Sequence, residues 1–301
     1  MESNTCFYGK LMLFGEYSVV RGSMALVIPY TNVSACLSFE NKNDLQMQQQ
    51  SNYELRKFYK YLKINKFASS YIHLDAFFEA LKKGLYLQSN VPSGYGVGSS
   101  GVLVAAVYQR FKTKKILDYV ALKTLFSSME SFFHGNSSGI DPLTSYLNVP
   151  VLVDADKQVR ISFSIGKKDI NVFLIDTKIK SKTAPLVNSF LQKLENDYFN
   201  KNFCDFYIPC VNNCITHFIA GNNVQFMETM QQLSEWQLEH MKPMIPDRFQ
   251  ALFAEKEKPF QLKICGSGGG GFLLGFTTDL LKTQVFFEDE NTQPIFLSES
   301  Y

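Results

Sequence analysis

The sequence Gly94-Tyr-Gly-Val-Gly-Ser-Ser100 places three glycines at alternate positions, and an apolar run from Gly101 to Val107 follows it directly. Glycine has no Cβ atom, so this backbone can turn tightly and approach a ligand closely. A helix that begins at the serines would direct its free N–H groups and the positive end of its dipole toward the loop. A phosphate is the natural ligand of such a loop. The alternative, equally compatible with these residues alone, is a flexible glycine-rich turn.

The composition is that of an ordinary globular protein. With 301 residues, of which 46% are hydrophobic and 19% charged, the chain can bury a large core and form two domains. A net charge of +2 argues against a nucleic-acid-binding protein, which would usually carry a concentrated basic face. The aromatic content of 14% is normal for a core. We therefore expect no nucleic-acid partner.

The N-terminal residues and the cysteine pattern predict the cellular compartment. Residues 1–8 contain no basic stretch followed by an apolar core, and no apolar run is long enough to span a membrane. The six cysteines include no CxxC pair, and the four histidines lack metal-ligand spacing. Cys210 and Cys214 lie one helical turn apart, which favours two small core residues over a metal site. We expect a cytoplasmic protein in a reducing compartment, without a membrane partner.

The order of strand-like and helical segments favours an α+β fold over a doubly wound sheet, because it lacks strict βαβ alternation. Residues 41–52 are rich in Asn and Gln and predict an exposed loop. Residues 261–276 predict two strands with a glycine-rich bend between them. The other predicted strands lie within 11–20 and 24–39 and at 150–154, 159–165 and 171–175, and the helices lie at 72–85, 99–111, 116–133, 184–197 and 211–241.

A second informative stretch is Glu130-Ser-Phe-Phe-His-Gly-Asn-Ser-Ser-Gly-Ile-Asp141. A carboxylate at the end of a helix and another just past a glycine-containing turn can face one cavity from two directions. One acid could then hold a divalent cation while the other accepts a proton. The alternative is an exposed glutamate and an aspartate that caps a helix before Pro142. The spacing alone favours this alternative.

Two further stretches combine glycine with lysine. Gly266, Gly268 and Gly271 formally match GxGxxG, but a dinucleotide fingerprint requires a following helix, and Phe272 begins a strand-like segment. We therefore reject a Rossmann motif in favour of a bend that lets a ligand or another backbone come close. Lys10 either extends from the edge of an apolar strand toward solvent or, near phosphates, stabilises transferring negative charge.

Taken together and in this order, three segments resemble the motifs of the GHMP kinase superfamily, which includes galacto-, homoserine, mevalonate and phosphomevalonate kinases. Gly9-Lys10 with Gly15-Glu16 resembles the first motif. Residues 92–100 resemble the second motif, the ATP-phosphate loop, and residues 263–271 resemble the third.

Within the superfamily the likeness is greatest to the mevalonate kinases. Glu130 to Asp141 is similar to their Mg²⁺ and catalytic-base segment, and Thr177-Lys178 followed by Thr183 resembles their Thr-Lys…Thr segment. The resemblance implies an N-terminal ribosomal-protein-S5-like domain over residues 1–166 and a C-terminal ferredoxin-like domain over 167–301. The site would lie between them.

The resemblance also implies ATP and Mg²⁺ as cofactors and a role for each residue. Asp141 would take the proton of the substrate hydroxyl, Lys10 would stabilise charge, and Ser100 and Glu130 would hold Mg²⁺. Backbone N–H groups would bind the ATP phosphates from Gly94, Tyr95, Gly96, Val97, Gly98, Ser99 and Ser100. The substrate would contact Glu16, Tyr17, His134, Ser138, Thr183 and Gly268.

Two departures from the family pattern concern the first motif. Tyr8 replaces the usual proline before Gly-Lys, and Tyr17 stands where mevalonate kinases usually carry a histidine near the substrate. We expect an ATP- and Mg²⁺-dependent kinase of a small alcohol, with mevalonate, converted to 5-phosphomevalonate, as the best candidate. The alternatives are a GHMP kinase for phosphomevalonate or another hydroxy acid, a diphosphomevalonate decarboxylase, and a catalytically silent nucleotide- or metabolite-binding relative. The resemblance also implies a homodimer.

Overall fold

The computed structural model describes residues 5–39, 45–161, 169–288, 290 and 292–297, which fall into two compact units. The chain passes between these units several times, so neither unit is one continuous segment. The expected domain boundary at residues 166 and 167 lies outside the described residues. Unit 1 comprises Met1–Leu11, Val27–Pro92 and Val97–Val151, and unit 2 comprises Met12–Leu26, Ser93–Gly96 and Leu152–Tyr301.

The N-terminal sheet has the strand order β1-β2-β4-β5, with β3 also paired to β2. Strands β2 and β3 are antiparallel, with Ala35 opposite Ser89 and Phe39 opposite Leu85. The predicted strand at 24–39 is confirmed. Of the segment predicted at 11–20, only residues 11–14 are strand, at the end of a strand that begins at Cys6, and Val19–Arg21 form a 3-10 helix. The strands are β1 (Cys6–Phe14), β2 (Ala25–Phe39), β3 (Leu85–Ser89), β4 (Val151–Val153) and β5 (Val159–Arg160).

Helix α1 (Leu45–Ile64) corrects the prediction of an exposed loop at 41–52, of which residues 41–44 lie outside the described part. Two of its polar residues, Gln48 and Asn52, are buried on the same face as Leu55. The amide of Asn52 donates hydrogen bonds to the carbonyl oxygens of Leu81 and Leu85. A buried amide costs little free energy when it is hydrogen-bonded. A hydropathy pattern shows only that Asn52 is polar and does not show that these carbonyl oxygens satisfy it.

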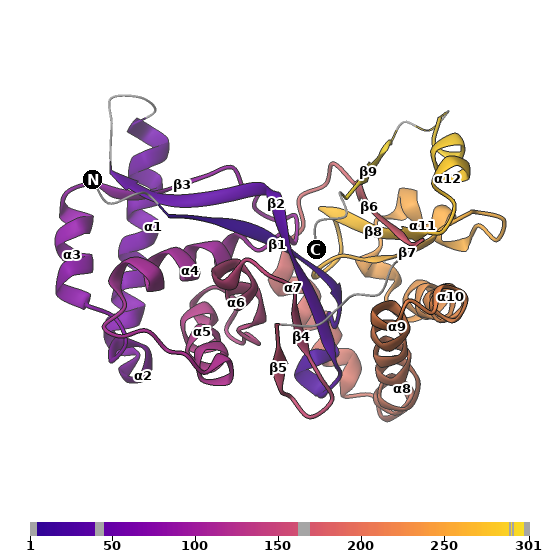
Figure 1. Cartoon of the computed structure of the whole chain (residues 1–301), viewed down its shortest axis with the longest axis horizontal. Helices are drawn as coiled ribbons and strands as arrows, with labels where there is room; N and C mark the ends of the chain where they lie inside the picture. Colours follow the sequence, from indigo (N-terminus) through magenta and orange to yellow (C-terminus); the bar gives the residue numbers. More distant parts are fainter. Residues whose placement is uncertain (1–4, 40–44, 162–168, 289, 291, 298–301) are drawn as a thin grey trace. The chain divides into compact units, whose positions relative to one another are not determined.

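Three of the remaining helices of unit 1, α3, α4 and α5, lie close to the predicted positions, whereas α2 and α6 were not predicted. The helix predicted at 72–85 ends at Lys82, because Gly84 turns the chain with a φ of 80° into β3. Helix α5 begins where the carboxylate of Asp118 accepts a hydrogen bond from the backbone N–H of Ala121. Figure 1 shows α4, α5 and α6 grouped on one side of β1 to β3. The helices are α2 (Lys66–Ser69), α3 (Leu74–Lys82), α4 (Ser99–Phe111), α5 (Tyr119–His134) and α6 (Ile140–Leu147).

Unit 2 contains an antiparallel sheet with the strand order β7-β8-β6-β9. Phe14 packs with Phe218, Phe226 and Phe276, whose ring centroids lie 5.4 to 6.1 Å from its own. Burying such a ring contributes about 1.5–3 kcal/mol, which explains why this N-terminal segment joins unit 2. The predicted strands at 171–175 and 261–276 are confirmed. The strands are β6 (Asn171–Asp176), β7 (Gln261–Ile264), β8 (Phe272–Thr277) and β9 (Pro294–Phe296).

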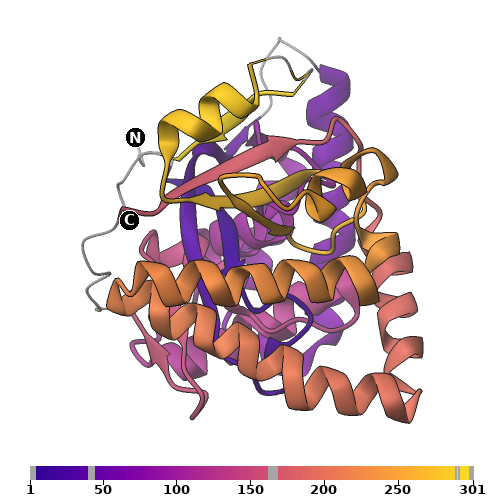
Figure 2. The ribbon, with the colours of Figure 1, turned by 90° about the vertical axis from the view of Figure 1, so that its right-hand side faces the viewer.

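The helices of unit 2 are interrupted where the sequence suggested long continuous ones. The predicted helix at 211–241 is two helices, because Gly221 adopts a φ of 73° and ends the first. Figure 2 shows these two helices, α9 and α10, lying side by side. The helices are α7 (Thr183–Leu194), α8 (Asp197–Asn202), a π-helical turn (Phe203–Tyr207), α9 (Ile208–Ala220), α10 (Asn223–His240), α11 (Asp247–Ala254) and α12 (Leu280–Phe286).

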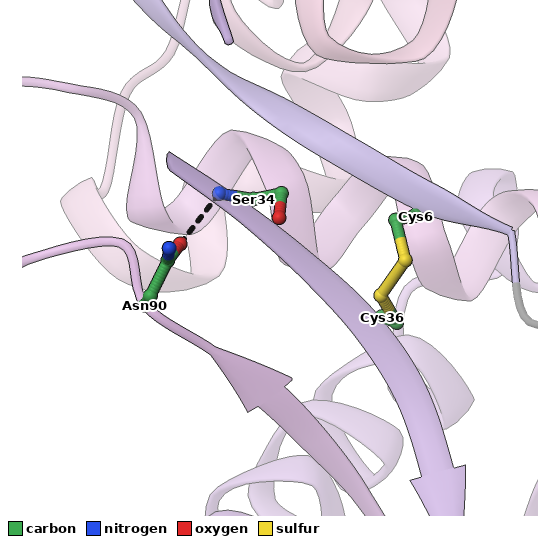
Figure 3. The surroundings of a disulfide bond; sticks show 4 residues. All are labelled: Cys6, Ser34, Cys36 and Asn90. Atoms are coloured by element: carbon green, nitrogen blue, oxygen red, sulfur yellow. Dashed lines mark hydrogen bonds between the residues drawn. A yellow bond between two sulfur atoms is a disulfide. The ribbon is translucent and has the colours of Figure 1, made fainter. Parts of the chain in front are cut away.

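A disulfide joins Cys6 to Cys36, on the neighbouring strands β1 and β2 (Figure 3). CxxC spacing does not reveal this pair, because the two cysteines lie 30 residues apart. Because these two cysteines form a disulfide, the absence of CxxC pairs no longer indicates a reducing compartment. Cys210 and Cys214 are buried, as predicted for core residues. Within the described part of the chain, no helix is long and apolar enough to cross a membrane.

Candidate active site

In unit 1, strand β1 and helix α6 bring Lys10 and Asp141 together. The ammonium Nζ of Lys10 lies 2.8 Å from Oδ2 of Asp141, and the lysine side chain is only 4% exposed. The backbone N–H of Lys10 donates to the carbonyl oxygen of Val97 at 3.0 Å, which ties β1 to the glycine-rich loop. The other carboxylate oxygen of Asp141, Oδ1, is buried and has no hydrogen-bond partner among the described residues. A buried carboxylate oxygen without a donor has an unused capacity to accept a proton or a hydrogen bond.

Glu130 is the second carboxylate of this site; it is 3% exposed, whereas the side chain of Asp141 is 24% exposed. Its Oε1 accepts a hydrogen bond from the hydroxyl of Ser100 at 2.8 Å, and its Oε2 accepts one from the hydroxyl of Ser137. Burial and the negative charge of Asp141 raise the pKa of Glu130 to about 7, although both hydroxyls and Lys10 oppose the rise. Two mutually repelling carboxylates in a buried place favour either a shared proton or an added cation.

A magnesium ion fits these residues. Mg²⁺ is held in proteins by one or two carboxylates together with waters and substrate phosphates, so it needs no complete cage of side chains. Accordingly, the described residues include no group of three or more His, Cys, Asp or Glu that could hold a metal ion. The carboxylate of Glu130 and the hydroxyl of Ser100, which are hydrogen-bonded to each other, supply the hard oxygen ligands that such an ion prefers.

The glycine-rich loop has the predicted backbone geometry. Gly94, Gly96 and Gly98 have φ angles of 80°, 75° and 83°, in the left-handed region that favours glycine. Gly98 is also the N-cap of α4, so the helix begins at Ser99, as predicted. A Cβ atom at Gly98 would lie 2.8 Å from Cγ of Lys10. Glycine is therefore required there by both its φ angle and its neighbour.

In unit 2 the first part of this loop approaches two other backbone segments. The carbonyl oxygen of Gly94 accepts a hydrogen bond from the N–H of Ser181 at 3.0 Å. The ring of Tyr95 packs edge to face against Phe272. A Cβ atom at Gly271 would lie 2.6 Å from Cα of Tyr95. Strand β8 follows the glycine-rich stretch, so the rejection of a dinucleotide fingerprint and the prediction of close backbone approach are both confirmed.

Glu16 is held by an ion pair that the sequence did not indicate. Its Oε1 lies 2.6 Å from Nζ of Lys263, and the two side chains are 3% and 1% exposed. The same ammonium donates a hydrogen bond to the carbonyl oxygen of Ile264 at 2.7 Å. Removing either partner would leave an uncompensated buried charge, which is costly. Glu16 is thus fixed within unit 2 through Lys263.

Tyr17 adopts a φ of 63°, which is uncommon for a residue other than glycine. Its hydroxyl donates a hydrogen bond to the carbonyl oxygen of Ser267 at 2.7 Å, and its ring packs on Phe190. Burial and the charge of Glu16 raise the pKa of the Tyr17 hydroxyl, so it stays protonated. The hydroxyl of Ser267 lies 3.3 Å from that of Thr183. The predicted residues Tyr17 and Thr183 are therefore linked through Ser267, which sequence reasoning missed.

Three further predicted residues have different surroundings. Gly268 lies in the glycine-rich bend, and a Cβ atom there would lie 2.5 Å from the carbonyl oxygen of Met244. His134 is the last residue of α5, and its side chain lies outside the described part of the structure. The hydroxyl of Ser138 accepts a weak hydrogen bond from the N–H of Ile140. The hydroxyl of the adjacent residue, Ser137, donates a hydrogen bond to Glu130. The spacing of the sequence does not show which of the two adjacent serines makes this contact.

This chain resembles known proteins in its structure. No protein-family model matches the chain, and no curated protein matches its sequence. The phosphomevalonate kinase of Streptococcus pneumoniae, solved with phosphomevalonate and AMPPNP, matches with a TM-score of 0.62, 17% identity and coverage of 93% of each chain. The L. major mevalonate kinase, solved with R-mevalonate, matches with a TM-score of 0.60 and 16% identity, covering 100% of this chain and 97% of that one.

A third similar structure is the Lactococcus lactis galactokinase complexed with galactose, with a TM-score of 0.65 and 13% identity, covering 98% of this chain and 93% of that one. These likenesses confirm the predicted α+β class and the GHMP kinase fold. The three structures hold three different acceptors, and at this identity the likeness carries the fold alone.

Proposed function

We propose that the chain is an ATP- and Mg²⁺-dependent kinase that transfers the γ-phosphate of ATP to the hydroxyl group of a small molecule. The observation that carries this proposal is the Lys10–Asp141 pair, in which Asp141 keeps one buried carboxylate oxygen without a partner among the described residues. A general base must be within hydrogen-bond reach of the proton it takes, and it must have a lone pair to accept that proton. Oδ1 of Asp141 meets the second requirement.

Each of the site residues that lie in unit 1 has a defined task in the proposed reaction. Asp141 accepts the proton of the substrate hydroxyl at Oδ1 while Lys10 holds Oδ2 and fixes the orientation of the carboxylate. Lys10 also supplies positive charge where negative charge develops. Ser100 and Glu130 would hold the magnesium ion, which would neutralise negative charge on the phosphates. Ser137 orients Glu130 by donating to its second oxygen.

The glycine-rich loop would bind the phosphates of ATP. Backbone N–H groups of residues 94–100 and the N-terminus of α4 offer donors and a positive dipole end to an anion. The phosphomevalonate kinase that shares the fold was solved with AMPPNP, which supports ATP as the phosphate donor. Phosphoryl transfer requires mostly positioning and electrostatic stabilisation, and these few groups can supply both.

Mevalonate is the acceptor that we propose, with 5-phosphomevalonate as the product. The support is the resemblance of residues 130–141 to the mevalonate kinases and the fold shared with a mevalonate kinase. Glu16, Tyr17, His134, Ser138, Thr183 and Gly268 would contact it. Phosphomevalonate or another hydroxy acid is the second candidate, because Tyr17 replaces the usual histidine and donates its hydroxyl to Ser267.

The other parts of the proposal concern assembly and location. A homodimer is implied by the resemblance, and sedimentation would test it. We also propose a cytoplasmic location, where ATP is abundant. The Cys6–Cys36 disulfide opposes this part, because disulfides are rare in reducing compartments. Counting free thiols in protein isolated from its native cells would decide it.

The test is coupled ADP release by the purified protein with ATP and Mg²⁺, against mevalonate, phosphomevalonate, galactose and several hydroxy acids. Turnover with mevalonate alone supports the full proposal. Turnover with another acceptor keeps the kinase and replaces the substrate. If ATP binds but no acceptor on the panel is phosphorylated, the proposed reaction is wrong for these acceptors and the silent-relative alternative gains support.

A further inference from the structure

Ser181, Thr183 and Ser267 form a hydroxyl cluster within unit 2. The side-chain oxygen of Ser267 lies 3.4 Å from that of Ser181 and 3.3 Å from that of Thr183. Thr183 is the first residue of α7, and Ser267 lies in the glycine-rich bend between β7 and β8. All three residues are partly exposed, so a ligand or water can reach this part of unit 2.

The hydroxyl of Tyr17 is committed to this cluster. A phenol has one proton to donate, and that of Tyr17 is donated to the carbonyl oxygen of Ser267 at 2.7 Å. Burial and the charge of Glu16 raise the pKa of Tyr17, so the proton is retained. The ring packs on Phe190 with 4.5 Å between the centroids, which fixes the direction of the hydroxyl. Tyr17 therefore cannot donate to a substrate and keep this bond.

The backbone of the bend is held at two successive carbonyl groups. Tyr17 donates to the carbonyl oxygen of Ser267, and the hydroxyl of Ser181 donates to that of Gly268. A single torsion angle separates the backbone of a serine from its side-chain oxygen, and that angle has three staggered values. By holding the backbone of Ser267, Tyr17 therefore fixes where the hydroxyl of Ser267 lies.

The hydrogen bonds of the cluster leave one proton unused. Ser267 donates its hydroxyl proton to the oxygen of Thr183. Within the part of the chain that the structure describes, the hydroxyl of Thr183 accepts this bond and donates none. The pair Ser267–Thr183 is thus a donor chain, in which the proton of Thr183 remains for an oxygen of a ligand or of water.

We propose that the Ser267–Thr183 donor chain binds an oxygen of the phosphate acceptor, and that the hydroxyl of Tyr17 is a positioning group for this chain. The inference rests on the proposed function. Thr183 donates to the acceptor, and Ser267 strengthens that bond by donating to Thr183, because successive hydrogen bonds polarise one another. Tyr17 contributes through Ser267 and makes no hydrogen bond to the acceptor itself.

The test is calorimetric titration of the full chain with mevalonate in the presence of AMPPNP, which allows binding without transfer. Ser267→Ala should weaken mevalonate binding by about five- to ten-fold, as expected for one hydrogen bond. Tyr17→Phe keeps the ring on Phe190 and should weaken it by a similar factor. Both variants should raise KM for mevalonate by the same factor and leave kcat and the affinity for ATP within about two-fold of the wild type.

The double variant separates positioning from direct contact. If the hydroxyl of Tyr17 acts only through Ser267, Tyr17→Phe combined with Ser267→Ala binds mevalonate as Ser267→Ala alone does, within about two-fold. Two independent contacts would instead multiply the two losses, to about 25- to 100-fold, and this result would overturn the proposal. The matched control Tyr198→Phe, at a tyrosine of α8 that is 76% exposed, should bind as the wild type does.

Two substitutions of Thr183 test the donated proton. Thr183→Ser keeps the hydroxyl and should bind mevalonate within about two-fold of the wild type, whereas Thr183→Val keeps the shape and should bind about five- to ten-fold more weakly. Equal affinities of these two variants would contradict the proposal.

The outcomes for the donor chain and for the kinase are distinguishable. If the wild type phosphorylates mevalonate and Ser267→Ala binds it with full affinity, the kinase stands and the donor chain is wrong. If Ser267→Ala loses affinity but the wild type transfers no phosphate, the donor chain is supported and the proposed reaction is wrong. A wild type that does not bind mevalonate overturns the donor chain, while turnover of another acceptor would still support a kinase.

Discussion

Replacing Glu130 by glutamine should change how the stability of the protein depends on pH. The residue is buried, and its pKa is raised from 4.5 to about 7. Between these values the folded protein binds more protons at Glu130 than the unfolded chain does, so the free energy of unfolding falls as pH rises through this window. At about 1.4 kcal/mol per pKa unit, the full loss is about 3 kcal/mol.

Glu130→Gln keeps the shape of the side chain and one acceptor oxygen but has no charge to bury. The hydroxyls of Ser100 and Ser137 can rotate to accept from its amide, and any hydrogen-bond loss is a constant offset at all pH values. The variant should therefore gain stability over the wild type as pH rises. Between pH 5 and pH 8 we expect this gain to amount to about 2–3 kcal/mol.

The assay is urea unfolding followed by circular dichroism at pH 5, 6, 7 and 8, without divalent cations. Glu228→Gln, at an exposed position of α10, controls for the loss of one carboxylate. A difference between Glu130→Gln and the wild type that does not change with pH would refute the reasoning. Added Mg²⁺ at pH 8 should stabilise the wild type and not Glu130→Gln if Glu130 holds the ion.

Three other changes test separate parts of the structure. Gly98→Ala should lower stability by about 1–3 kcal/mol, since alanine is strained at this φ angle and its Cβ would meet Lys10; an unchanged urea midpoint would contradict this. Ser137→Ala should cost about 1 kcal/mol at pH 8, where Glu130 is charged, and less at pH 5; the same unfolding series measures it. Cys6→Ser should lower stability by about 3–4 kcal/mol, because the disulfide to Cys36 closes a loop with a separation of 30 residues. Thermal unfolding of protein prepared with and without reductant checks the last value, and equal melting temperatures would rule out a stabilising disulfide.

The α+β class and six of the twelve α-helices in the described part of the chain could be predicted, because they depend on local signals. The glycines of residues 94–98 have left-handed φ angles, and the helix after them begins at Ser99 as its serines and apolar run indicated. The strand after Gly271 likewise follows the continuous apolar run that begins at Phe272. Such features are fixed by residues within a few positions of one another.

Features that depend on residues far apart in the sequence could not be predicted. Helix α1 was mistaken for a loop in part because Asn52 is satisfied by carbonyl oxygens of residues about 30 positions away. The disulfide of Cys6 and the ion pair of Glu16 with Lys263 also join distant segments. The pairing of Lys10 with Asp141 was implied by the family resemblance but not by spacing, which favoured a simple helix cap.

The central claim is that Asp141 acts as the base of a phosphoryl transfer, and turnover by Asp141→Asn tests it most directly. The substitution keeps the size of the side chain but removes the negative charge and the basicity with which the carboxylate accepts the substrate proton. With the best acceptor of the panel, we expect kcat to fall by about 10²–10⁴-fold while the affinity for ATP, measured by calorimetry, stays close to that of the wild type. Activity near that of the wild type would contradict the assignment of the base and the account built on it.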